Sequence, residues 1–69
     1  MSEKTEFAQR LRKLRGGIPQ SVLSELCGLD RNSIRRYEEG QIYPGWESIK
    51  KIADYFNVSI DYLMGKINS

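Results

Sequence analysis

Apolar side chains recur along this chain at the three- and four-residue spacing of amphipathic helices. Phe7, Leu11 and Leu14 form the first such stripe, and the glycine pair at 16–17 ends it. Pro19 then suits the first turn of a second helix, because a missing N–H donor costs nothing there. The pattern therefore predicts two consecutive short helices separated by a glycine turn.

The second of these helices is short, and Gly28 ends it. Its buried side holds Val22 and Leu23, and the spacing leaves open whether Leu26 or Cys27 completes it. The turn after it contains Gly28 and has few residues, which is typical of the connection in a helix-turn-helix unit.

The pattern over residues 29–40 predicts a third helix. We expect Asp30 to cap its N-terminus, because the carboxylate can accept hydrogen bonds from N–H groups of the first turn. Gly40 supplies the left-handed residue after its end. Ile34 and Tyr37 are its only large buriable side chains.

Two further helices complete the pattern. Residues 45–56 predict the fourth, from apolar positions at helical spacing: Trp46, Ile49, Ile52 or Ala53, and Phe56. Asn57 can end this helix, and Ser59 can cap a fifth that ends at Gly65.

No segment alternates apolar and polar residues for long enough to predict a strand, and no repeat or linker divides the chain. We therefore predict an all-α fold, a compact bundle of five short helices forming a single domain over residues 1–69, with its core between about 6 and 65. The expected core side chains are Leu11, Leu14, Leu23, Leu26, Ile34, Trp46, Ile49, Ile52, Phe56 and Leu63.

The composition excludes several classes of protein. Cys27 is the only cysteine, so no disulfide can form within the chain, and a lone thiol favours a reducing compartment such as the cytoplasm. No apolar run approaches the roughly 18 residues of a membrane span, and no signal-peptide pattern is present. The absence of histidine, of Cys/His metal spacing and of a glycine-rich phosphate loop argues against an enzyme, a metal site and a bound cofactor.

The net charge of +2 is unevenly distributed. Residues 10–36 hold seven basic residues against two acids, whereas the rest of the chain holds four against seven. A basic half of this kind suits a polyanionic partner, although a solvated helix surface would give the same imbalance.

The third helix has an exposed face suited to nucleic acid. With about 100° per residue, Asn32, Arg35 and Arg36 fall opposite Ile34. Arginine can hold guanine and asparagine can hold adenine by two hydrogen bonds in a major groove that admits a helix. A solvated polar face explains the same residues, so this helix alone leaves both readings open.

Glu38 falls at the edge of the buried stripe and therefore needs a basic partner. Arg15, at the end of the first helix, is the candidate for a structural ion pair. The alternative is that Glu38 simply reaches water.

Two consecutive segments, "PQSVLSELCGLDRNSIRRYEEG" and "YPGWESIKKIADYFNVSIDYLMG", resemble the Cro/CI-type, or lambda-repressor-like, helix-turn-helix DNA-binding domain. The resemblance covers about residues 7–65 and implies a helix-turn-helix at the second and third helices. The matching residues occur in the family's order: Gln20, Gly28, Ile34, Tyr37, Glu38, Gly40, Pro44, Ile49, Ile52, Ala53, Val58, Ser59, Asp61 and Leu63.

The resemblance implies roles for individual residues. Those expected to face DNA bases are Arg31, Asn32, Ser33 and Arg36. Those expected at the DNA backbone are Gln20, Ser21, Arg35, Gln41 and Tyr43, with base contact also open for Arg35. The resemblance further implies that Gln20 braces the third helix and that Arg15 pairs with Glu38.

The chain departs from the family pattern at three places. The turn at 15–20 is about two residues shorter than the common form. In the second helix, Ser24 stands where alanine is usual and Cys27 occupies a core-side position, both small enough to keep the packing. The loop at 40–45 lacks the lysines that many relatives carry.

These features predict a sequence-specific transcriptional regulator, bacterial or phage-encoded, that represses by binding an inverted-repeat operator in double-stranded DNA. The alternative is an antitoxin or protein-interaction module of the same fold, which would show aromatic or aliphatic anchors on its third helix. We expect neither a small-molecule ligand nor a membrane as a partner.

Proteins that read DNA in this way bind two half-sites as dimers. The predicted homodimer surface consists of Ile60, Tyr62, Met64, Ile67 and Pro44. The alternative is that Ile60 and Tyr62 only cover the core edge of a monomer.

Overall fold

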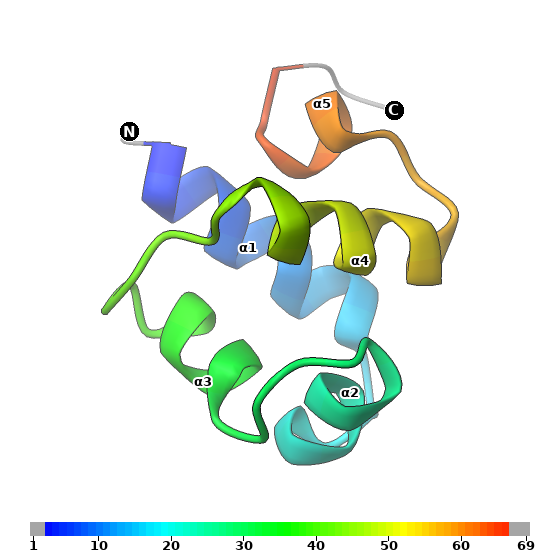
Figure 1. Ribbon diagram of the computed structural model, residues 1–69. Coiled ribbons are helices and arrows are strands. Elements are labelled where there is room, and N and C mark those ends of the chain that lie inside the picture. The colour runs from blue at the N-terminus through cyan, green and yellow to red at the C-terminus, as the bar shows by residue number, and fades with distance from the viewer. Residues whose placement is uncertain (1–2, 67–69) are drawn as a thin grey trace.

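A computed structural model describes residues 3–66 and places five helices around one core (Figure 1). The helices are α1 (Glu3–Arg15), α2 (Gln20–Leu26), α3 (Ser33–Glu38), α4 (Trp46–Phe56) and α5 (Ile60–Leu63). No strand occurs in the part of the chain that the structure describes, and the predicted all-α bundle is confirmed.

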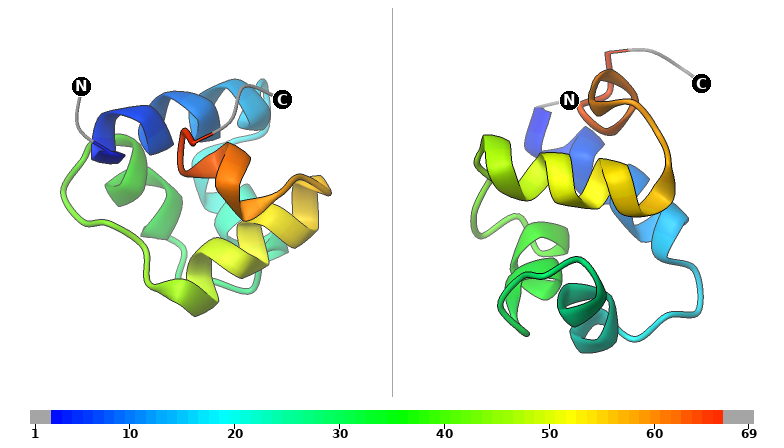
Figure 2. Two further views of the ribbon diagram at one scale, coloured as in Figure 1. Left: turned by 90° about the horizontal axis from the view of Figure 1, so that it is seen from above. Right: turned by 45° about the vertical axis from the view of Figure 1, so that its right-hand side comes forward.

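The long helix α1 joins the two halves of the bundle, since it packs against both α3 and α5. In the right-hand view of Figure 2, the α2–α3 pair lies below α1 and α4, and α5 lies above them. Within residues 3–66, none of the helices has the length and apolar character to span a bilayer.

All five helices of the described residues end where the sequence predicts. Gly16 and Gly28 adopt positive φ angles of 55° and 74° after α1 and α2, and Asn57 does so at 55° after α4. Gly40 and Gly65 also adopt positive φ angles after α3 and α5. The Ser59 hydroxyl accepts a hydrogen bond from the Tyr62 N–H at 3.0 Å, so the predicted cap of α5 is present.

The third helix is shorter than predicted. It begins at Ser33, and Asn32 rather than Asp30 stands at its N-terminal boundary, without a side-chain cap. The Asp30 carboxylate instead accepts from the Asn32 N–H at 3.1 Å. Aspartate commonly bonds the N–H two residues on, which closes a turn and delays the start of the helix.

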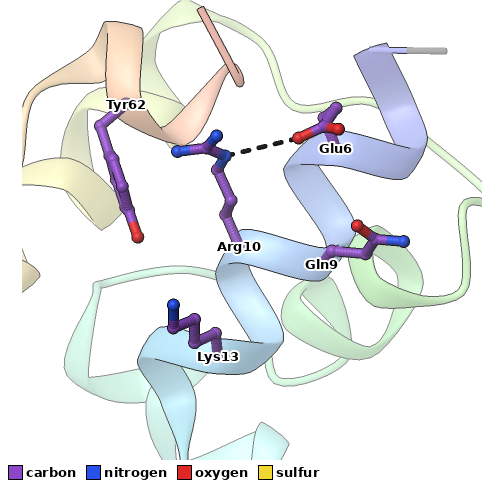
Figure 3. A pocket seen from close by; sticks show the side chains of 5 residues that line it. All are labelled: Glu6, Gln9, Arg10, Lys13 and Tyr62. Carbon is purple, nitrogen blue, oxygen red and sulfur yellow. Dashed lines mark hydrogen bonds and ion pairs between the residues drawn. The ribbon is translucent and has the colours of Figure 1, made fainter. Parts of the chain in front are cut away.

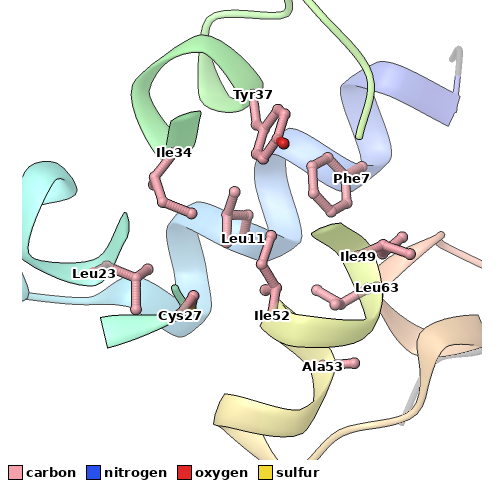
Figure 4. Close-up of a cluster of buried hydrophobic side chains, with 10 residues drawn as sticks. All are labelled: Phe7, Leu11, Leu23, Cys27, Ile34, Tyr37, Ile49, Ile52, Ala53 and Leu63. Carbon is pink, nitrogen blue, oxygen red and sulfur yellow. The ribbon is translucent and has the colours of Figure 1, made fainter. Parts of the chain in front are cut away.

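Apolar side chains from all five helices meet in the core (Figure 4). They are Phe7, Leu11, Leu23, Cys27, Ile34, Tyr37, Ile49, Ile52, Ala53 and Leu63. Leu14 and Phe56, also predicted in the core, pack against it while only partly buried.

Three side chains predicted to be buried are exposed instead: Val22 is 45 %, Leu26 53 % and Trp46 66 % exposed. Cys27, four residues after Leu23, completes the buried stripe of α2 and turns Leu26 toward solvent. Trp46 has the right spacing from Ile49, but it is the first residue of α4 and no other element covers it.

Candidate nucleic-acid interface

A buried hydroxyl fixes the start of α3 against α2. Ser24 Oγ donates to the Gln20 carbonyl oxygen at 2.9 Å and accepts from the Ile34 N–H at 3.1 Å. The Ile34 N–H lies in the first turn of α3, where a helix offers its own N–H groups no partner. The sequence indicated Ser24 only as a small residue in place of alanine, so this role was missed.

A buried carboxylate holds the other end of α3. The Glu38 side chain is 1 % exposed, and Arg15 donates to it from Nε at 2.6 Å and from Nη2 at 2.9 Å. Two parallel bonds of this kind are the strong, directional form of an arginine–carboxylate pair. The structure therefore contains the ion pair predicted from the sequence, despite the short turn at 15–20.

Two more side chains reach the same carboxylate. Gln20 donates from Nε2 to Glu38 Oε1 at 3.0 Å, so it braces α3 from the start of α2. Arg12 lies 3.5 Å from the same oxygen through Nε, and its Nη2 lies 3.4 Å from the Glu38 carbonyl oxygen. Sequence reasoning did not single out Arg12, because nothing in the spacing shows that it reaches α3.

The donors keep Glu38 ionised. Burial by itself raises the pKa of Glu38, but hydrogen bonds from Arg15 and Gln20, with a smaller contribution from Arg12, outweigh it and hold the pKa below the ordinary value of 4.5. The hydrogen bond to Glu38 likewise raises the pKa of Arg15, so both partners carry full charge at neutral pH.

The outer side of α3 and the turn before it carry the residues predicted to face bases. Arg31 and Arg36 are exposed, whereas Asn32 and Ser33 are partly exposed. Within residues 3–66, neither Arg31 nor Arg36 is engaged in an ion pair, so both guanidinium groups face solvent with their donors available.

Residues from two helices share a shallow basic hollow beside this face. Its open volume is about 240 Å³, and it is lined by Gln20, Ser21, Arg31, Asn32 and Arg35. All five were predicted to contact DNA, and the fold brings them together at the starts of α2 and α3.

The Glu39 carboxylate accepts hydrogen bonds from two residues that are predicted to contact the DNA backbone, Arg35 and Gln41. Its Oε1 accepts from Arg35 Nη1 at 3.4 Å and from Gln41 Nε2 at 2.7 Å. The Arg35 and Glu39 side chains are both well exposed, and exposed ion pairs of this kind are weak and easily exchanged for another anion.

The last predicted backbone-contacting residue, Tyr43, points into the chain. Its hydroxyl donates to Met64 Sδ at 2.7 Å, and its ring packs edge-on against Phe7 with the centroids 5.7 Å apart. Its hydroxyl is therefore engaged inside the molecule.

The predicted dimer residues do not form one exposed surface. Pro44 is buried by its own chain, which corrects its assignment to an interface, because a buried side chain offers no contact area. Ile60 and Met64 pack partly against the core, and Tyr62 lies under the Arg10 guanidinium, 4.6 Å from its ring centroid. Ile67 lies outside the described residues.

A comparison with known proteins gives one family and several relatives. A family model described as helix-turn-helix matches residues 9–63. The chain is 39 % identical over 61 residues to the HTH-type transcriptional activator BcrR of Enterococcus faecalis, covering 86 % of this chain and 30 % of BcrR. It is 35 % identical over 63 residues to the cryptic phage CTXphi transcriptional repressor RstR of Vibrio cholerae, covering 88 % and 56 % of the two chains.

A third relative is the HTH-type transcriptional regulator ImmR of Bacillus subtilis, which is 32 % identical over 62 residues, covering 87 % of this chain and 49 % of ImmR. The chain thus spans little more than half the length of these relatives, or less. No solved structure matches the chain.

Proposed function

The chain belongs to the Cro/CI-type helix-turn-helix family, and we propose from this premise that it binds double-stranded DNA sequence-specifically and regulates transcription. The observation that carries the proposal is the outer side of α3 with the turn before it, where Arg31 lines a hollow with Gln20, Ser21, Asn32 and Arg35. Within residues 3–66, no ion pair engages Arg31 or Arg36. The relatives' names, a transcriptional activator, a repressor and a regulator, support the same function.

The base-reading roles fall to Arg31, Asn32, Ser33 and Arg36. Arginine matches the paired acceptors of guanine, asparagine matches adenine, and a serine hydroxyl can donate or accept. Ser24 at the start of α3 and Glu38 at its end fix this short helix before DNA arrives. A prearranged helix loses little conformational entropy on binding.

The backbone-positioning roles fall to Gln20, Ser21, Arg35 and Gln41, which flank the reading residues. The Gln20 amide nitrogen donates one of its two N–H groups to Glu38, and the other can donate to a phosphate oxygen. Contacts of this kind set the register of the protein on the duplex without reading its sequence.

We further propose that two copies bind an inverted repeat whose half-sites are about 34 Å apart. The surface for pairing is Tyr62 with the exposed parts of Ile60 and Met64. We propose that the regulator represses by covering the promoter; the relative RstR is named a transcriptional repressor.

Selection of bound sequences from a random DNA library tests these proposals together. The wild-type chain should enrich an inverted repeat, whereas the Arg31→Ala/Arg36→Ala variant should lose the preference at the base pairs that these two arginines read. Enrichment of a single half-site would contradict the dimer, and no enrichment by the wild type would contradict specific DNA binding.

One observation favours a different function, that of a module whose main partner is a protein. Trp46 is the most exposed large apolar side chain reported among the described residues, and it borders an open hollow with Glu47, Lys50, Lys51 and Asp54. Exposed tryptophan is common at the centre of protein interfaces. Under the DNA-binding proposal, Trp46→Ala should leave the selected sequence unchanged.

A further inference from the structure

We propose that Arg12, on α1 and outside the helix-turn-helix itself, contacts a phosphate of the bound DNA. This inference rests on the proposed DNA-binding function and assigns a residue that the family resemblance did not. It follows from the charge balance, the exposure and the position of Arg12 at the end of α3.

The single negative charge of Glu38 is already neutralised by Arg15, so Arg12 carries an additional positive charge. Arg15 neutralises Glu38 through Nε and Nη2, and its Nη1 donates to the Ile18 carbonyl oxygen at 2.9 Å. With its side chain only 18 % exposed, Arg15 is committed to the interior. Glu38 has one negative charge for two arginines, so the positive charge of Arg12 is not compensated there.

Arg12 is also held loosely. Its side chain is 63 % exposed, and its contacts to Glu38 of 3.5 and 3.4 Å exceed the 2.7–3.2 Å of ordinary N–H···O bonds. It can therefore turn toward an external anion without leaving Glu38 unpaired, since Arg15 and Gln20 remain in place.

Arg12 lies next to the basic hollow, on the side where Gln20 lines it. Arg12 and Gln20 approach the same oxygen, Glu38 Oε1, so the guanidinium lies beside the Gln20 amide. Gln20 in turn lines the hollow with Ser21 and the outer residues of α3. A phosphate at this edge would meet the Gln20 amide and the planar guanidinium fork, which suits paired phosphate oxygens.

The next residue, Lys13, provides a matched control. It is exposed, and it lines a separate hollow with Glu6, Gln9, Arg10 and Tyr62, on the side of α1 that faces α5 (Figure 3). Arg12→Gln and Lys13→Gln each remove one positive charge from adjacent positions of one helix, so any difference between them reports on position.

The experiment measures the affinity of both variants for the selected duplex and for a random-sequence duplex as salt rises from about 50 to 200 mM. Arg12→Gln should reduce the slope of log affinity against log salt by about 0.9 for each bound copy and weaken binding to both duplexes alike, by roughly five- to tenfold per copy. Lys13→Gln should keep the wild-type slope. Arg12→Lys should also keep it, because the charge remains.

Four outcomes would overturn the proposal. Equal slopes for Arg12→Gln and Lys13→Gln, with the wild type still binding DNA, would contradict the phosphate contact of Arg12. The proposed DNA-binding function would be unaffected by that result. A loss confined to the selected duplex would indicate a base contact. A lower melting temperature of Arg12→Gln with the slope unchanged would make Arg12 purely structural. No salt-dependent binding by the wild type would overturn the proposed function and this contact together.

Discussion

Glu38 carries a negative charge inside the protein, and its stabilising effect depends on pH. Because its donors hold the pKa below 4.5, the contribution of Glu38 to folding is fully present above that value and is lost as the pH falls through the lowered pKa. The pKa of Arg15 is raised by its hydrogen bond to Glu38, so Arg15 stays charged over this pH range and does not change the direction of the effect.

We expect Glu38→Gln to lower the free energy of unfolding at pH 7 by about 3–5 kcal/mol, because it leaves the buried Arg15 charge unpaired. The difference from the wild type should shrink as the pH falls below 4.5. Denaturant unfolding at a series of pH values, with an osmolyte to keep both proteins folded, measures this. Glu39→Gln, at the exposed neighbour, should follow the wild-type curve, and a Glu38→Gln curve parallel to the wild type would contradict the assignment.

Ser24 is a second position where one polar atom has a defined effect. Ser24→Ala leaves the buried Ile34 N–H without its acceptor, and we expect the free energy of unfolding to fall by about 1–3 kcal/mol. Ser48→Ala, in α4, should change it by no more than about 0.5 kcal/mol. Equal effects of the two substitutions in denaturant unfolding would show that the Ser24 bond contributes nothing.

The element proposed to decide DNA recognition is α3, whose six residues have buried and exposed sides. Ile34 and Tyr37 anchor it to the core, while Arg36 projects outward. Substituting an anchor would test the fold, whereas substituting an outward residue tests recognition.

We expect Arg36→Ala to cost about 1–3 kcal/mol of binding free energy on the selected duplex and to relax the preference at one base pair. Gln20→Ala should instead weaken all sequences about equally, because a backbone contact carries no sequence information. Fluorescence anisotropy with single-base-pair variants of the duplex measures both. An equal loss for Arg36→Ala on specific and random DNA would reassign Arg36 to the backbone.

At the scale of the whole molecule, α1 joins the half that is proposed to read DNA to the half that is proposed to pair two copies. Gln9, Arg10 and Lys13 of α1 share a hollow with Tyr62 of α5, whereas Arg12 and Arg15 reach α3. One helix therefore fixes the position of the reading surface relative to the proposed dimer surface.

We expect Tyr62→Ala to weaken the dimer and to reduce affinity for the inverted repeat more than affinity for a single half-site. Sedimentation equilibrium with and without DNA measures the first effect, and binding to the two duplexes measures the second. Tyr55→Ala, which removes another partly exposed tyrosine on α4, is the control. Equal losses on both duplexes would show that Tyr62 acts within one copy.

The sequence by itself determined most helix boundaries, because they depend on local chemistry. Gly16 and Asn57 end helices by adopting the left-handed conformation, and Ser59 caps α5 with its own hydroxyl. The start of α3 was predicted too early, since Asp30 can cap a helix or close a turn, and the local sequence allows both.

Tertiary structure decided which residues are covered and which polar groups meet. Helical spacing identifies the face on which Trp46 lies but not whether another element packs over it. The sequence could pair Arg15 with Glu38, one acid with one base. It could not show that Arg12 and Gln20 converge on the same carboxylate, or that Ser24 receives the Ile34 N–H, because these contacts join helices whose relative positions only the packed core fixes.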